Sequence, residues 1–145
     1  AHMVTAANAA RYVLYRCTES GTPINNWRLQ NILYYLQIAF YTAFHRPCFE
    51  EDIEAWACGP VIPGVYFRYC AAGAASVAVQ DTEAASVFTK DEQKIADEVI
   101  RKKGHLRSFY LEQDVKKKGR AWALTYEDAG EKRKIIPGER LRTEG

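Results

Sequence analysis

The sequence lacks the short motifs that mark most nucleotide-dependent or metal-dependent enzymes. It has no G-x-x-x-x-G-K-[ST] loop, no G-x-G-x-x-G after a predicted strand and no C-x-x-C pair. Besides His2, the only histidines are His45 and His105, which lie far apart and do not complete a usual zinc pattern. We therefore expect no cofactor and no metal, and we expect the cysteines to be reduced, partly buried thiols. The cysteines are Cys17, Cys48, Cys58 and Cys70.

Long hydrophobic runs are also absent. No stretch approaches the roughly 20 apolar residues of a membrane span. The N-terminus has no basic region followed by an apolar one and a small-residue cleavage site. The first residues, Ala1-His2-Met3, resemble the remains of an expression tag and are set aside. With 145 residues, 48% of them hydrophobic, the chain can form one ordinary core. We expect a cytoplasmic protein with no membrane contact and a single domain over residues 4–145.

Apolar residues at helical spacing dominate the first third of the chain. Thr5 predicts the N-cap of a helix that ends near Cys17. A longer helix is predicted after Asn25 and Asn26, and it is apolar nearly all round. Such a helix is the central element of a domain or has one face covered by another molecule. The predicted fold is mostly α, a single compact helical domain around this helix with a few short strands. One apolar face comprises Leu29, Ile32, Leu33, Leu36, Phe40, Ala43 and Phe44.

The stretch IEAWACGPVIPGVY, residues 53–66, predicts a sharp corner. Gly59 can adopt a positive φ, whereas Pro60 and Pro63 fix φ near about −65° and lack an amide donor. The stretch is therefore neither one helix nor an interior strand. We predict an extended segment over residues 53–57, a turn at Gly59-Pro60, and a helix that begins at Pro63 and ends near Gly73. We interpret Gly59, Pro60, Val61 and Pro63 as a structural motif.

The second half predicts shorter elements. A strand is expected within residues 76–79. Thr89 and Glu92 fit a capping box at the start of a helix that Gly104 stops. Shorter helices are expected over residues 106–114 and 122–128, and a strand over residues 133–136 that Pro137 ends.

Charge is unevenly distributed, although the net charge is only +2. Residues 1–89 hold five basic and seven acidic side chains, and residues 90–145 hold fifteen and eleven. Lys116, Lys117, Lys118 and Arg120 form the densest basic run and suggest a nucleic-acid patch, because each neutralised phosphate adds affinity. Acidic residues lie near every basic run, so we expect solvated surface here. Binding of nucleic acid or of an acidic protein patch remains the alternative.

Two sets of residues suggest catalysis, and both are incomplete. The acidic residues Glu50, Glu51, Asp52 and Glu54 are expected to form a solvated loop, because sequence spacing alone does not place two carboxylates in one cleft. His45 and Cys48 lie close in sequence, but no third orienting group or oxyanion-donating loop accompanies them. We expect that the protein is not an enzyme.

Several motifs together resemble a known family. They are IN-x-x-x-LQ-x-ILYY-x-Q, RPCFEEDIEAW, GPV-x-P-x-VY, and a W-A-x-TY before a strand that ends in IIP. In this order and spacing the chain, from about Ala6 to Pro137, resembles the Panacea domain family, the SocA/GepA-like phage-associated antitoxin domain.

The resemblance implies a function. Members of that family are mainly antitoxins of toxin–antitoxin pairs, often in phages and prophages, and they neutralise a toxin by binding it. The implied partner is a cognate toxin, with enzymes related to alarmone synthetases among the known toxins. At least one type is a proteolytic adaptor, so a cellular protease is a further implied partner. A nucleic-acid-binding phage accessory protein is the alternative. For the partner-binding face we name Trp56, Tyr66 and Arg68, residue types that often anchor interfaces.

Overall fold

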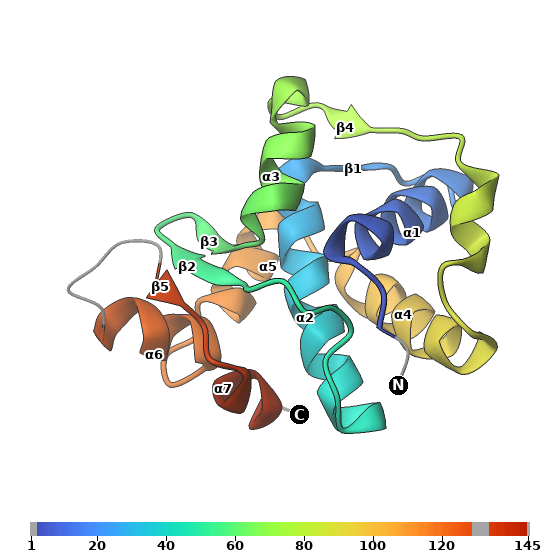
Figure 1. Cartoon of the computed structure of the whole chain (residues 1–145). Helices are drawn as coiled ribbons and strands as arrows, with labels where there is room; N and C mark the ends of the chain where they lie inside the picture. The colour runs from blue at the N-terminus through green and yellow to red at the C-terminus, as the bar shows by residue number, and fades with distance from the viewer. Residues whose placement is uncertain (1–2, 129–133, 145) are drawn as a thin grey trace.

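One long helix, α2, passes through the middle of the molecule, and the other helices are arranged around it (Figure 1). The computed structural model describes residues 3–128 and 134–144. The prediction of a mostly α fold around a central hydrophobic helix is confirmed. The α-helices are α1 (Ala6–Glu19), α2 (Asn26–Phe44), α3 (Pro63–Tyr69), α4 (Lys90–Lys103), α5 (Ser108–Val115), α6 (Ala121–Asp128) and α7 (Gly138–Arg142). The 3₁₀ helices are η1 (Cys70–Ala72) and η2 (Thr82–Ser86).

Local signals set both ends of α2. The side chain of Asn25 caps the helix by accepting a hydrogen bond from the amide of Arg28 at 2.9 Å. His45 ends it with a left-handed backbone, φ 58°. Most of the predicted apolar face is in the core, where Leu29, Ile32, Leu33, Leu36 and Phe40 are buried. Near the end of the helix Ala43 is exposed and Phe44 is partly buried, so the prediction is wrong for Ala43. Helices α1, α3, α4, α5 and α7 all pack on α2, so this helix sets the positions of most other elements.

Two small antiparallel sheets complete the fold. In the first, β1 (Ile24–Asn25) pairs with β4 (Ser76–Val77), within the predicted strand region. In the second, β2 (Glu54–Trp56) lies between β3 (Gly59–Val61) and β5 (Lys134–Ile135). The predicted strand ending at Pro137 is thus present at residues 134–135, and Arg133 lies outside the described residues.

The prediction of a turn at Gly59-Pro60 is wrong. These residues form the start of β3, with Pro60 opposite Ala55, and the turn of the hairpin lies at Ala57-Cys58. Pro60 is tolerated because β3 is an edge strand. Among the described residues no further strand pairs with its open side, so the missing amide donor costs no hydrogen bond there. The stretch is neither one helix nor one strand, as expected, although β2 within it is the central strand of its sheet. The helix does begin at Pro63.

Other boundaries differ by a few residues. Helix α1 continues past Cys17 to Glu19, and α5 is shifted by one or two residues from the expected range. The short helix η2 was not predicted, because its alanine-rich sequence has little periodicity. The capping box of α4 is confirmed: Thr89 and Glu92 exchange both side-chain to backbone hydrogen bonds.

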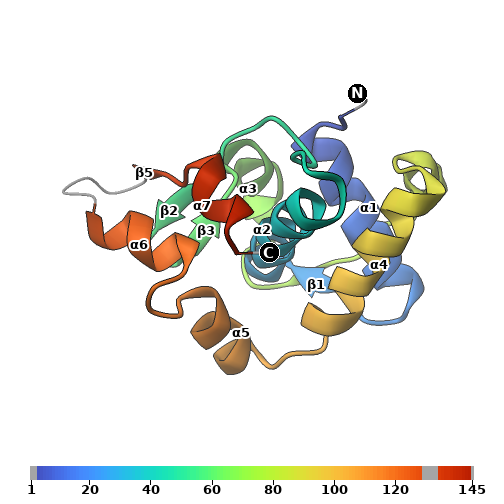
Figure 2. The same cartoon turned by 90° about the horizontal axis from the view of Figure 1, so that it is seen from below.

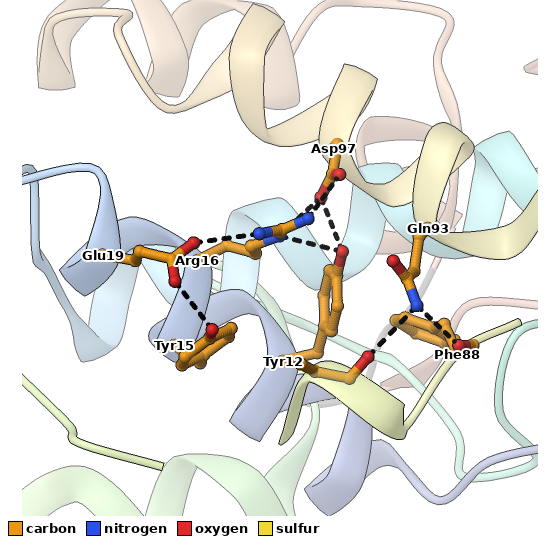
Figure 3. Close-up of polar contacts among 8 residues, drawn as sticks. Tyr12, Tyr15, Arg16, Glu19, Phe88, Gln93 and Asp97 are labelled. Atoms are coloured by element: carbon orange, nitrogen blue, oxygen red, sulfur yellow. Dashed lines mark hydrogen bonds and ion pairs between the residues drawn. The ribbon is translucent and has the colours of Figure 1, made fainter. Parts of the chain in front are cut away.

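A polar cluster joins α1 to α4 (Figure 3). The Tyr12 hydroxyl donates to Asp97 at 2.7 Å, and the Arg16 guanidinium donates to the same carboxylate at 3.1 Å. Arg16 also pairs with Glu19 at 2.9 Å. Burial, together with the hydrogen bond to Asp97, raises the pKa of Tyr12, so its hydroxyl remains a donor. The cluster fixes the first helix on the fourth.

None of the helices in the described ranges has both the length and the hydropathy of a membrane span.

Candidate protein-binding site

Two tryptophan side chains hold the β2–β3 hairpin at its turn. The indole N–H of Trp27, from α2, donates to the carbonyl of Cys58 at 3.2 Å. The indole N–H of Trp122, from α6, donates to the carbonyl of Trp56 at 2.9 Å. Gly59 follows the turn with φ +138°, a conformation that residues with a side chain rarely adopt. Thus the hairpin turn has a fixed position between the second and sixth helices.

Buried amide side chains attach α3 to the central helix. Gln30 accepts from the Ile62 amide at 2.9 Å and donates to Asn26 at 3.0 Å. Asn26 in turn donates to the Tyr66 carbonyl at 3.0 Å. Because unpaired amides are costly to bury, these bonds specify one orientation of α3. Gln30, which belongs to the first family-like motif, therefore has a structural role.

Three aromatic rings meet where the hairpin adjoins α3. We call Trp56, Tyr66 and Phe67 the aromatic corner. The ring of Tyr66 lies 5.3 Å, centroid to centroid, from the rings of both Trp56 and Phe67, and the Trp56 and Phe67 rings are 6.3 Å apart. Phe67 is 58% exposed, whereas Trp56 and Tyr66 are half-buried. Solvent thus reaches an aromatic surface, and hydrogen bonds fix the positions of the hairpin and the helix that carry it.

The structure brings together two of the three predicted anchors. Trp56 and Tyr66 are neighbours, as described above, and the indole N–H of Trp56 also donates to Glu54 at 2.8 Å. Arg68 is exposed, and among the described residues it forms no ion pair and no cation–π contact. Phe67 was not among the anchors predicted from the sequence. Its position two residues after the buried Val65 points away from the core on a helix, which is the signal that could have identified it.

The structure divides the predicted basic patch. Lys116 pairs with Glu112 at 2.9 Å, and Arg120 pairs with Glu144 at 2.5 Å. Lys117 and Lys118 are exposed. The further basic residues Lys132 and Arg133 lie outside the described residues. Two of the four patch cations therefore already have carboxylate partners.

Two of the four acidic residues in the segment 50–54, Glu51 and Glu54, have structural contacts. Both oxygens of Glu51 accept from the Ala6 amide at 3.1 Å and so cap α1. Glu51 therefore acts as a helix cap and, in the part of the chain that the structure describes, shows no pairing with a second carboxylate of the kind that acid–base catalysis needs. Glu54 accepts from an indole N–H, as noted for the aromatic corner.

The four thiols are free and differ in burial. Cys17 and Cys48 are buried, and burial raises the pKa of Cys17 to about 11. Burial raises the pKa of Cys48 as well, which is opposite to what a nucleophilic thiolate requires. His45 is exposed at the end of α2. Cys58 and Cys70 are exposed. Within residues 3–128 and 134–144, no three His, Cys, Asp or Glu side chains gather as metal ligands.

Comparison with known proteins assigns the chain to a family. Residues 29–123 match the family described as "Antitoxin SocA-like, Panacea domain". This match covers most of α2, the hairpin, α3 to α5 and the start of α6, so the chain belongs to that antitoxin family.

One characterised relative is similar over part of its length. It is the protein named Antitoxin SocA of Caulobacter vibrioides (strain NA1000 / CB15N), 36% identical over 70 residues. The aligned part is 48% of this chain and 37% of the relative, so the match spans little more than a third of that protein. No solved structure matches the chain.

Proposed function

We propose that this protein is an antitoxin that neutralises a cognate toxin by direct, stoichiometric protein–protein binding, and that the aromatic corner contacts the toxin. The observation that carries the proposal is the 58% exposure of Phe67, which lies on α3 beside Tyr66 and next to Trp56 of a hairpin whose turn is fixed. Membership of the antitoxin family supports the same conclusion.

The geometry of the aromatic corner suits a binding anchor. Aromatic side chains bury a large area on binding and lose few rotamers, so they often dominate the binding energy. The Trp27 and Trp122 hydrogen bonds hold the turn before a partner arrives, which reduces the entropy cost of association. Arg68 is exposed on α3, the helix that carries Tyr66 and Phe67, and is available for a polar contact at the rim of the interface.

The proposal assigns no catalytic step to this chain, which would act in the cytoplasm. The family resemblance makes an alarmone-synthetase-like enzyme the leading candidate for the toxin, with phage or prophage genes as the expected setting. Delivery of the bound toxin to a cellular protease is an alternative outcome of the same binding event.

The first test uses the protein encoded by the adjacent open reading frame as the toxin. Purified toxin is titrated with this protein in an assay that contains no protease. We expect toxin activity to disappear at a fixed molar ratio that equals the stoichiometry of the complex. Full protection at far lower ratios would contradict neutralisation by binding.

A second test locates the interface. The variant Phe67→Ala should keep the fold, because the side chain is exposed, and should weaken toxin binding by more than about 1 kcal/mol. Trp56→Ala should act in the same direction. The matched control is Leu124→Ala, which removes an exposed apolar side chain from α6 and should leave the affinity unchanged. A folded Phe67→Ala protein with normal affinity would remove the aromatic corner from the interface.

Nucleic-acid binding through residues 116–120 is the competing function. The ion pairs of Lys116 and Arg120 reduce the charge that this patch offers to phosphates. Salt-sensitive binding of DNA or RNA at micromolar or lower concentration and physiological ionic strength, together with no toxin complex, would favour this function over the antitoxin proposal.

A further inference from the structure

We propose that α5 carries a second protein-binding surface, separate from the aromatic corner, which takes an acidic segment of a protein partner that bears an apolar side chain. The surface consists of Phe109 and Tyr110 with the cations Arg107, Lys117 and Lys118, and we call it the α5 surface. Its apolar part would hold the partner's apolar side chain, and its cations would attract the partner's carboxylates.

The two rings are more exposed than ordinary packing requires. Phe109 is 64% exposed and Tyr110 is 55% exposed, and their centroids are 5.6 Å apart. The opposite side of α5 is well packed, with Leu111 and Val115 buried. The helix therefore has apolar side chains on both its inner and outer faces, although solvent surrounds the outer one. Adjacent exposed aromatic rings of this kind mark interaction sites more often than isolated apolar residues do.

Basic side chains predominate in the segment that carries these rings. Residues 101–120 contain eight Lys or Arg and two acidic residues. Five of the eight cations form ion pairs: Arg101 and Lys102 with Glu98, Lys103 with Asp114, Lys116 with Glu112, and Arg120 with Glu144.

The remaining three cations are Arg107, Lys117 and Lys118. They are exposed and have no carboxylate partner within the ranges that the structure describes. The local charge thus complements an acidic partner.

Contacts from α2 position the α5 surface. The guanidinium of Arg28 donates to the carbonyl of Leu106 at 2.5 Å and to that of Gly104 at 3.3 Å, in the link from α4 to α5. The Tyr35 hydroxyl donates to Asp114, near the end of α5, and Lys103 pairs with the same carboxylate at 2.9 Å. The start and the end of α5 are therefore both fixed, at the margin of the molecule between α4 and α6 (Figure 2).

The ring geometry favours a protein partner over a nucleic acid. The planes of Phe109 and Tyr110 are inclined by 75°, with the edge of one ring against the other. Successive bases stack on exposed ring faces, which two perpendicular rings do not offer as a continuous platform. Rings in this edge-to-face arrangement instead expose an apolar edge and face that an aliphatic side chain can cover.

The test uses a fluorescein-labelled peptide of repeated Glu-Glu-Leu units as the probe, with the whole chain and fluorescence anisotropy as the readout. We expect binding that weakens with added salt. Phe109→Ala and Tyr110→Ala should each weaken it at least about fivefold. Lys117→Ser with Lys118→Ser should mainly reduce its salt dependence. Two matched controls should leave peptide binding unchanged: Leu124→Ala, an exposed apolar side chain on α6, and Lys94→Ser, an exposed lysine on α4.

Several results would overturn the α5 surface. One is equal binding of a peptide with serine in place of leucine, which would show charge attraction alone. Others are unchanged affinity in a Phe109→Ala protein with a normal thermal melt, no binding of the peptide at all, or tighter binding of a uridine oligonucleotide than of the peptide. Since the Phe67→Ala toxin assay tests the aromatic corner independently, failure of one surface does not decide the other.

Discussion

The indole N–H of Trp122 donates to the backbone carbonyl of Trp56 at 2.9 Å, across 66 residues of sequence. The amide of Trp122 also donates to the hydroxyl of Tyr34, in the central helix, at 3.3 Å. Trp122 thereby fixes α6 to the hairpin through its side chain and to α2 through its backbone amide. The orientation of the aromatic corner consequently depends on a residue near the end of the chain.

This relationship leads to the first prediction. Trp122→Phe keeps an aromatic ring that can stack on Tyr126, whose ring centroid is 4.8 Å away, but it removes the indole donor. The Trp56 carbonyl then loses its side-chain partner, which should cost about 1 to 2 kcal/mol of unfolding free energy. Urea unfolding followed by circular dichroism measures the loss. The matched control is Trp27→Phe, which should cost less because its hydrogen bond, at 3.2 Å, is exposed to water.

The parts of the fold that could be predicted are those that local sequence determines. The apolar periodicity of residues 27–45, the Asn25 cap and the Thr89–Glu92 capping box act within a few residues, and the structure contains all of them. The hairpin turn was placed two residues too late. Its position depends on which residues of β2 and β3 face each other, and that register results from tertiary hydrogen bonds to the Cys58 and Trp56 carbonyls.

The second prediction concerns the core of α2. Leu33 and Leu36 are almost completely buried, so Leu33→Ala or Leu36→Ala should destabilise the protein by about 2 to 5 kcal/mol through lost burial and a cavity. Thr42→Ala, on an exposed turn of the same helix, should change stability by less than about 0.5 kcal/mol. Denaturant melts of the three variants check this. Equal effects for leucine and threonine would mean that the core is assigned to the wrong face.

The third prediction concerns a buried amide. Gln37 accepts from the amides of Cys48 and Phe49 at 2.8 and 3.2 Å and donates to the Phe49 carbonyl at 2.9 Å. Gln37→Leu keeps the side-chain volume but leaves these backbone groups without partners, so it should cost at least about 2 kcal/mol. The control Gln113→Leu changes an exposed glutamine and should be nearly neutral. Similar melting curves for both variants would contradict a structural role for Gln37.

The candidate site was less predictable than the fold, for reasons that particular residues show. Trp56 and Tyr66 were named because of their residue types, but their contact depends on the packing of α3 against the hairpin. The basic run at residues 116–120 suggested a continuous patch. The carboxylate that neutralises Arg120 belongs to Glu144, which is 24 residues away in sequence, and only the folded chain shows that pairing. The exposure of Phe67 could have been predicted from simple helix periodicity, whereas the ion pairs could not.

The last prediction concerns pH and the ion pair between Arg46 and Glu92, whose closest atoms are 2.7 Å apart. The Glu92 side chain is only 4% exposed. Burial alone would raise its pKa, but the hydrogen bond from the Thr89 amide and the contact with Arg46 outweigh burial, so the pKa lies below the ordinary value. Because the pKa is lower in the folded state, Glu92 stabilises the fold fully above its unfolded pKa of about 4.3. This stabilisation is lost as the pH falls through the lower, folded value.

Glu92→Gln isolates the charge, because glutamine also serves in a capping box. At pH 7 the variant should be less stable than the wild type by about 1 to 3 kcal/mol, less than for a fully buried pair because Arg46 stays partly exposed. Urea unfolding of both proteins from pH 7 to pH 3 measures the difference, and contributions from the other carboxylates cancel between them. The difference should shrink below about pH 4.3 as Glu92 takes up a proton. Glu98→Gln, which removes an exposed pair with Arg101, should differ little from the wild type at any pH because water screens it. A constant difference between pH 7 and pH 3 would show that the Glu92 charge is not the stabilising feature.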